Sequence, residues 1–208
     1  MIQYVMASLL MHLAVAKRYL EKNGLDINDQ TSFYDANILP DFDDDKERSH
    51  YGKRGESKDL IKRHKEKVGL KKFLETRLCP YKLDTDMDRG LFLHLYTDWI
   101  YYNELLPLDY LATIDMTVFP KDNVYTSIVF DPYLEKTYGM NYGLTSMQEQ
   151  VKEQFVKWNL FDEKRWGKDF SAKILFTKEQ LDDFIELASE LQIDEIVKLV
   201  QSGKIDVE

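Results

Sequence analysis

Turn-forming residues are scarce in this chain of 208 residues, which contains 9 glycines and 5 prolines. A sandwich or barrel of many short strands needs frequent turns, so the scarcity argues against such all-β folds. The chain has a single cysteine, Cys79, so no disulfide can form within it, and a reduced cytoplasmic setting is the simpler expectation. No stretch reaches the ~18 apolar residues that a membrane span requires.

The chain also lacks an excess of positive charge. Its formal net charge is −9, which argues against a protein that grips nucleic acid with its whole surface. The segment Lys46–Lys72 departs from this trend, because eleven lysines and arginines there face four aspartates and glutamates, a local charge of +7. Such a segment is usually a solvated helix face. The alternative is an electropositive rim beside a site for an anionic substrate.

Helical patterns cover most of the chain. Hydrophobic residues make up 44% of it, enough for a packed core, and no linker forces a domain boundary. We therefore predict a single all-α domain over residues 1–208. Thr31–Ile38 is ambiguous, Asp41–Glu56 is predicted to be a loop, and Asp169–Phe176 could form a short strand. The predicted helices are Tyr4–Lys22, Lys58–Arg77 with Ser57 as its N-cap, Asp86–Glu104, Val124–Tyr138, Thr145–Trp158, Thr177–Leu191 and Asp194–Gln201.

Two of these helices are expected to lie in the core. The opening stretch Met1–Ala16 is similar in composition to a secretion signal, but it lacks a basic leading region and carries His12 in its apolar run. We interpret it as the first core helix. Asp86–Glu104 is apolar or aromatic nearly all round from Leu91 onward, which predicts a central helix covered on all sides.

The strongest local signal for chemistry is His94 with Asp98. A spacing of four places both side chains on one helix face, one turn apart. An ionised carboxylate in a buried helix needs a cation or several hydrogen bonds, and no lysine or arginine occurs between Leu91 and Asn103. A metal ion would satisfy both residues, whereas a hydrogen-bonded His–Asp pair with a structural role is the alternative.

Three further residues could join this pair. His12 taken alone is more often a satisfied core histidine than a ligand. Asp41 and His50 lie nine residues apart and could converge on one ion, although both also suit an ordinary turn. A calcium-binding EF-hand is excluded because Lys46 stands where that loop needs glycine and Gly52 where it needs glutamate. A single metal site accounts for His12, Asp41, His50, His94 and Asp98 together.

These motifs, in this order, resemble the zinc-dependent phospholipase C family, and most closely a branch of small bacterial members. Fungal single-strand nucleases share that fold. The resemblance covers roughly the first half of the chain and implies an all-α, multi-helix phospholipase C-like bundle with a metal site between helices and one loop. The residues that carry it are Met11–Lys17, Leu39-Pro40-Asp41, Ser49–Gly52 and Phe92–Asp98.

The resemblance also implies roles for individual residues. Asp41, His50, His94 and Asp98 would bind one metal, and His12 would serve a neighbouring metal with Asp98 bridging. Asp41 would also orient or deprotonate the attacking water. The secreted enzymes of the family carry further histidines after the helical motif, and this chain has none after His94. We therefore expect one zinc ion or two, with iron or manganese as alternatives for such nitrogen and oxygen donors.

The candidate metal site and the family resemblance suggest three possible functions. The favoured one is a metal-dependent phosphoesterase that hydrolyses an anionic phosphoester with a metal-activated water. The second is a catalytically inactive family member whose metal is structural and whose surface binds a partner. The third, an HD-type phosphohydrolase, is disfavoured because no His-Asp dipeptide occurs in the chain. The oligomeric state is left open by the sequence.

Overall fold

The described part of the chain folds into helices, in agreement with the all-α prediction. The computed structural model describes residues 7–23, 27–52, 59–113, 119–158 and 172–205, and within these ranges no strand is present. No helix in those ranges is both long and apolar enough to cross a membrane. The elements are α1 Leu9–Asn23, α2 Gln30–Ile38, the 3-10 helix η2 Leu39–Phe42, α3 Lys46–His50, α4 Leu60–Lys65, α5 Leu70–Glu75, α6 Asp86–Ile100, the π-helical turn η3 Tyr101–Leu105, α7 Leu108–Thr113, α8 Phe119–Tyr138, the 3-10 helix η4 Tyr142–Leu144, α9 Gln148–Trp158, α11 Lys178–Ala188 and α12 Ile193–Gln201.

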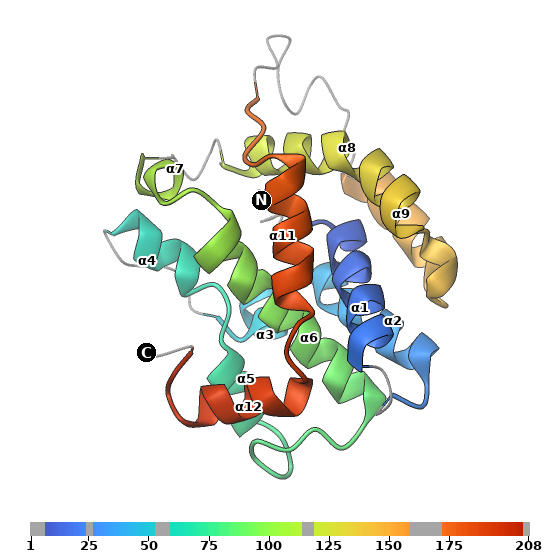
Figure 1. Ribbon diagram of the computed structural model, residues 1–208, viewed down its shortest axis with the longest axis vertical. Coiled ribbons are helices and arrows are strands. Elements are labelled where there is room, and N and C mark those ends of the chain that lie inside the picture. Colours follow the sequence, from blue (N-terminus) through green and yellow to red (C-terminus); the bar gives the residue numbers. More distant parts are fainter. Residues whose placement is uncertain (1–6, 24–26, 53–58, 114–118, 159–171, 206–208) are drawn as a thin grey trace.

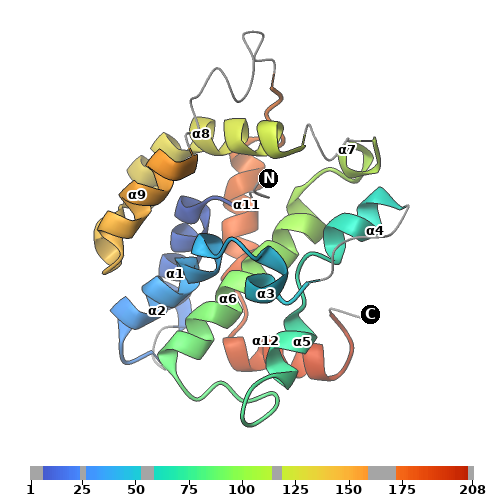
Figure 2. The same cartoon turned by 180° about the vertical axis from the view of Figure 1, so that it is seen from behind.

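Helix α6 runs through the middle of the molecule (Figure 1). It contacts α1, α2, α5, α11, α12 and η2, so its neighbours surround it as the apolar sequence predicts. Helix α11 lies in front of it in Figure 1, and in Figure 2, seen from behind, α3 lies in front of it while α2 runs alongside it. Residues 92–98 of α6 are all buried.

A glycine allows α6 to pack unusually close to α2. A Cβ atom added at Gly90 would lie 2.4 Å from the carbonyl oxygen of Phe33 and 2.9 Å from the Cβ of Ala36. Only a residue without a side chain permits this approach. It also places His94, one turn further along α6, beneath the last turn of α2.

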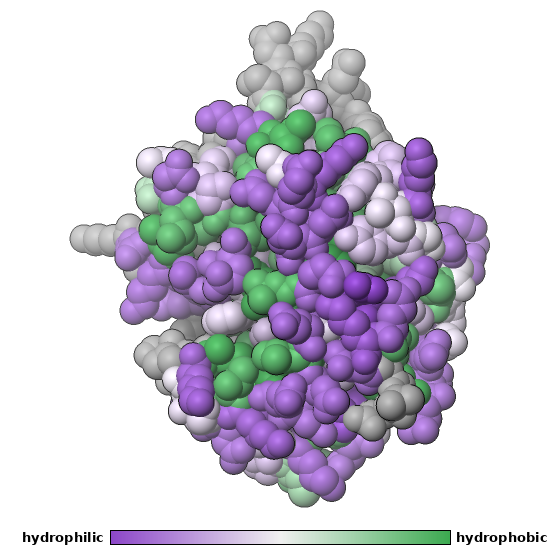
Figure 3. Space-filling model, viewed as in Figure 1, coloured by the Kyte–Doolittle hydropathy of each residue, from purple (hydrophilic) through white to green (hydrophobic). Residues whose placement is uncertain are grey.

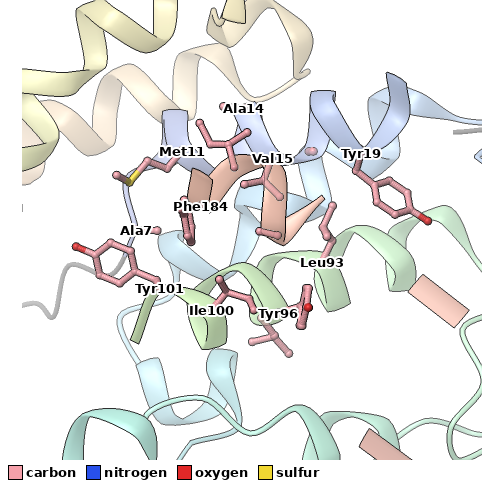
Figure 4. Packing of buried hydrophobic residues seen from close by; sticks show 14 of the residues in the cluster. Ala7, Met11, Ala14, Val15, Tyr19, Leu93, Tyr96, Ile100, Tyr101 and Phe184 are labelled. Carbon is pink, nitrogen blue, oxygen red and sulfur yellow. The ribbon is translucent and has the colours of Figure 1, made fainter. Parts of the chain in front are cut away.

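The hydrophobic core gathers side chains from the beginning, middle and end of the chain. Figure 4 shows Met11 and Val15 of α1 close to Phe184 of α11 and Ile100 of α6. All four are at most 3% exposed, so these side chains are shielded from solvent. On the face of the molecule shown in Figure 3, hydrophobic patches are separated by hydrophilic side chains.

The prediction of one helix over Lys58–Arg77 is wrong. The structure has two helices, α4 and α5, and the chain between them pairs with another segment. Val68 forms an isolated antiparallel bridge with Tyr51, and the amide of Gly69 donates to the carbonyl of His50 at 3.0 Å. These backbone contacts replace the hydrogen bonds that a continuous helix would make. The proposed N-cap at Ser57 lies outside the described residues.

Other boundaries differ by smaller amounts. The predicted loop Asp41–Glu56 contains the end of η2 and all of α3, because Asp45 caps α3 by accepting from the amide of Arg48. Residues 172–176 form no strand, and residues 169–171 lie outside the described part of the chain. Thr177 and Gln180 form the capping box that their spacing predicts.

Candidate metal centre

The structure brings all five predicted ligands into one cluster. His12 comes from α1, Asp41 from η2, His50 from α3, and His94 and Asp98 from successive turns of α6. The three histidines and Asp98 are fully buried, and Asp41 is 5% exposed. Two overlapping groups of three residues have the spacing of a metal site: His12 with Asp41 and His94, and His50 with His94 and Asp98.

Asp98 lies at the centre of the cluster. Its carboxylate oxygens are 3.4 Å from the Nε2 atoms of His12, His50 and His94. Burial alone would raise its pKa, but the neighbouring histidines outweigh burial and hold the pKa of Asp98 far below its usual range. Oδ1 accepts a 3.3 Å hydrogen bond from the amide of Ala7, whereas Oδ2 has no hydrogen-bond partner. These contacts favour the ionised carboxylate of Asp98, whose Oδ2 is unpaired.

Asp41 faces the same space from the other side. Its Oδ2 lies 3.7 Å from Nε2 of His12, and its Oδ1 lies 3.7 Å from Nε2 of His50. The ammonium of Lys46 contacts Oδ1 at 3.0 Å. Burial opposes ionisation, yet Lys46 and the histidines together hold the pKa of Asp41 below its ordinary value.

The proton of His94 can be placed from its contacts. Its Nδ1 lies 2.7 Å from the backbone carbonyl of Asn37, and because a carbonyl can only accept, Nδ1 carries the hydrogen. Burial, assisted by His12, lowers the pKa of His94 to about 3, so the ring is neutral near pH 7. Its Nε2 then presents a lone pair to the cluster, 3.1 Å from Nε2 of His50.

His12 is the least satisfied member of the cluster. Both of its ring nitrogens are buried without a hydrogen-bond partner. Its ring stacks on that of His94, with centroids 3.9 Å apart and planes 17° from parallel. Two unpaired nitrogens in a fully buried side chain are costly unless something binds them.

The donors fit a metal ion better than they fit a network of hydrogen bonds. The 3.4 and 3.7 Å separations between carboxylate and imidazole atoms exceed the 2.7–3.2 Å range of good N–H···O bonds. Two donors that each lie ~2.0–2.2 Å from one tetrahedral ion are themselves roughly 3.3–3.6 Å apart. The 3.4 Å contacts of Asp98 fall in this range, whereas the 3.7 Å contacts of Asp41 and the 3.1 Å separation of His50 and His94 lie just outside it. Nε2 of His12 and Oδ2 of Asp98 are unpaired nitrogen and oxygen atoms of the kind that a small divalent cation binds.

Three residues that contact the candidate ligands were not predicted from the sequence to support them. The carbonyl of Asn37 fixes the ring of His94, the hydroxyl of Ser49 lies 2.7 Å from Nδ1 of His50, and Lys46 pairs with Asp41. Such partners are common behind metal ligands, because they set the tautomer and orientation of each imidazole. A contact made by a backbone carbonyl cannot be recognised in a sequence, but a serine next to a candidate histidine can be.

A groove lies against the outer side of η2 and α3. Its volume is about 640 Å³, and its apolar lining comes from η2, α5 and α6 and from Tyr51, which follows α3. Ser49 links the groove to the cluster through His50, although the five ligands themselves do not line it. The residues around it are Leu39, Pro40, Phe42, Asp43, Asp44, Arg48, Ser49, Tyr51, Phe73, Leu91 and Leu95.

A scan against models of protein families gives no match for this chain, and searches of curated proteins and of solved structures give none either.

Proposed function

We propose that this chain binds one divalent metal ion in the cluster, with zinc as the first candidate and iron or manganese as alternatives. The observation that carries the proposal is the pair of buried atoms that face the cluster without a hydrogen-bond partner, namely Nε2 of His12 and Oδ2 of Asp98. Elemental analysis of protein purified without an affinity tag tests it directly. We expect about one metal ion per chain. A metal-free preparation that also fails to take up zinc would refute the proposal.

We further propose that the bound ion serves the hydrolysis of a phosphoester. A divalent ion at such a site supplies Lewis acidity and lowers the pKa of water. Asp41 is suited to orient that water, because it is ionised near neutral pH and is the ligand with measurable exposure. The resemblance of the ligand motifs to the zinc-dependent phospholipase C family supports this choice of reaction.

The test is a screen of zinc-loaded protein against phosphomonoester and phosphodiester substrates. We expect hydrolysis that disappears on chelation and in Asp41→Asn, while the fold, measured by circular dichroism, is retained. Hydrolysis that persists equally in Asp41→Asn would assign it to a contaminant or to another site.

The basic segment provides a separate test of the substrate's charge. Lys62 and Lys65 lie on α4, within the segment of local charge +7. If this segment attracts an anionic phosphoester, Lys62→Glu with Lys65→Glu should raise KM several-fold, leave kcat nearly unchanged and weaken the dependence of KM on salt concentration. An unchanged KM would remove the segment from substrate binding.

A structural role for the metal is the second candidate, and the burial of the ligands favours it. Four of the five are fully buried, and even the side chains of Asp41 and of Lys46 beside it are only 8% and 11% exposed. In this case the ion joins α1, η2, α3 and α6, and a surface binds a partner. Chelation would then unfold the protein, and no hydrolysis would be detected.

A further inference from the structure

Residues 7 and 8, which precede α1, contact two of the candidate metal ligands through their backbone. The amide of Ala7 donates to Oδ1 of Asp98 at 3.3 Å, and the amide of His12 donates to the carbonyl of Ser8 at 3.0 Å. Ala7 is 2% exposed and Ser8 is 9% exposed. The position of this dipeptide therefore affects both the orientation of the Asp98 carboxylate and the start of the helix that carries His12.

The side chain of Ser8 holds the dipeptide at two points. Its hydroxyl oxygen accepts from the amide of Met11 at 3.2 Å, which satisfies one of the free amides in the first turn of α1. Its hydroxyl hydrogen is donated to Oδ1 of Asp131 at 3.1 Å. A hydroxyl has a single hydrogen, so Asp131 takes the whole donor capacity of Ser8. Capping of α1 needs the oxygen of Ser8 and makes no use of Asp131, so the second contact has a separate role.

Asp131 ties the dipeptide to a helix that contributes none of the five candidate ligands. It lies in α8, 123 residues after Ser8 along the chain, and α8 packs against α1. In Figures 1 and 2, α8 crosses the molecule beside the end at which α1 begins. The hydrogen bond between Ser8 and Asp131 thus fixes the entry to α1 against the outer layer of helices.

We propose that Ser8 and Asp131 are a positioning pair for the metal centre. Their hydrogen bond keeps the amide of Ala7 on Oδ1 of Asp98, and with Oδ1 held in this way Oδ2 faces the histidines of the cluster. Both residues act through Asp98 and neither is a ligand. The inference rests on the proposed metal binding and adds two residues outside the ligand set on which zinc affinity depends.

The experiment compares Asp131→Leu with Asp131→Asn and with the wild type. Both replacements are uncharged and close to aspartate in size, but only the oxygen of asparagine can accept the hydrogen of Ser8. Neither change alters the oxygen with which Ser8 caps α1. Two quantities are measured: the rate at which the Ala7 amide exchanges its hydrogen in metal-free protein, by NMR, and the affinity for zinc, by competition with a chromophoric chelator.

The two variants should differ in both quantities. In Asp131→Asn we expect the Ala7 amide to exchange as slowly as in the wild type, and zinc to bind with nearly the same affinity. In Asp131→Leu the Ala7 amide should exchange faster and zinc should bind several-fold more weakly. The loss should be smaller than the roughly 10–100-fold that removal of a direct partner of a metal ligand costs, because Asp131 acts through Ser8 and Ala7.

A contact that only joins α8 to α1 gives a different result. It would lower the Tm of Asp131→Leu equally with zinc and with chelator, while Ala7 exchange and zinc affinity stayed as in Asp131→Asn. That result would overturn the inference while metal binding stands. If Asp131→Leu fails to fold, Asp131→Ala serves the same comparison, since it also lacks an acceptor and adds no larger side chain. Absence of zinc binding in the wild type would overturn both proposals.

Discussion

Replacing Asp98 with asparagine removes the central charge of the cluster while keeping the size of the side chain. Its carboxylate lies 3.4 Å from all three histidines, so no other single change touches as many of the predicted ligands. At free zinc a thousandfold above Kd, binding stabilises the fold by about 4.1 kcal/mol. For a chain of this size each kcal/mol is worth about 2–4 °C, so zinc should raise the Tm of the wild type by roughly 8–16 °C. A binding constant weakened about a hundredfold in Asp98→Asn leaves about 1.4 kcal/mol, or roughly 3–6 °C.

The assay is thermal unfolding of both proteins with excess zinc and with a chelator. Asp183→Asn is the matched control, because it makes the same chemical change at an exposed position of α11. It should show the full zinc-dependent shift. An equal shift in wild type and Asp98→Asn would refute the reasoning, since the ion would then bind elsewhere.

Two further predictions concern stability. Gly90→Ala places a methyl group 2.4 Å from the carbonyl oxygen of Phe33, so we expect a loss of about 1–3 kcal/mol in urea unfolding, and an unchanged midpoint would contradict the close packing of α2 and α6. Burial raises the pKa of Asp131 to about 7, with the charge of Glu135 adding to the effect and the hydrogen bond from Ser8 opposing it. Because the folded state keeps the proton of Asp131 up to about pH 7, the stabilisation that this proton gives is fully present below about pH 4. It is lost as the pH rises through 7. Asp131→Asn should therefore be more stable than the wild type at pH 8, on the order of 2–4 kcal/mol, with little difference at pH 4. Parallel pH profiles for the two proteins would show that Asp131 is not the group responsible.

Helix content could be predicted from the sequence because hydrophobic periodicity and caps are local. The capping box at Thr177 and the continuous apolar run of α6 are both seen in the structure. The break between α4 and α5 could not, because it depends on the pairing of Val68 with Tyr51, two residues whose proximity no local pattern reveals. Tertiary contacts of this kind override helix propensity.

His12, His94 and Asp98 stand out in the sequence because charges and histidines are rare in apolar segments, whereas Asp41 and His50 are indicated only by their spacing and by the family resemblance. Their convergence could only be hypothesised, since each also had an ordinary structural explanation. In the sequence, Lys46 is one member of the basic segment Lys46–Lys72 and stands where an EF-hand loop needs glycine. Its side chain curls back onto Asp41, five residues earlier, and this contact follows from the short turn between η2 and α3 rather than from residue type.

The orientation of the candidate ligands supports the proposed cation site over a self-contained polar cluster. The hydrogen bonds that hold the ligands use their outward-facing atoms: Nδ1 of His94 is bound to the carbonyl of Asn37, and Nδ1 of His50 to the hydroxyl of Ser49. Their Nε2 atoms and Oδ2 of Asp98 are left facing one another at 3.1–3.4 Å. With His94 fixed as an acceptor, three electron-rich atoms would repel one another unless a proton or a metal ion lay between them. One proton on His50 can serve only one of its two neighbours well, whereas a divalent ion binds all three at once, and the preset rings mean that little ordering entropy is lost when it does.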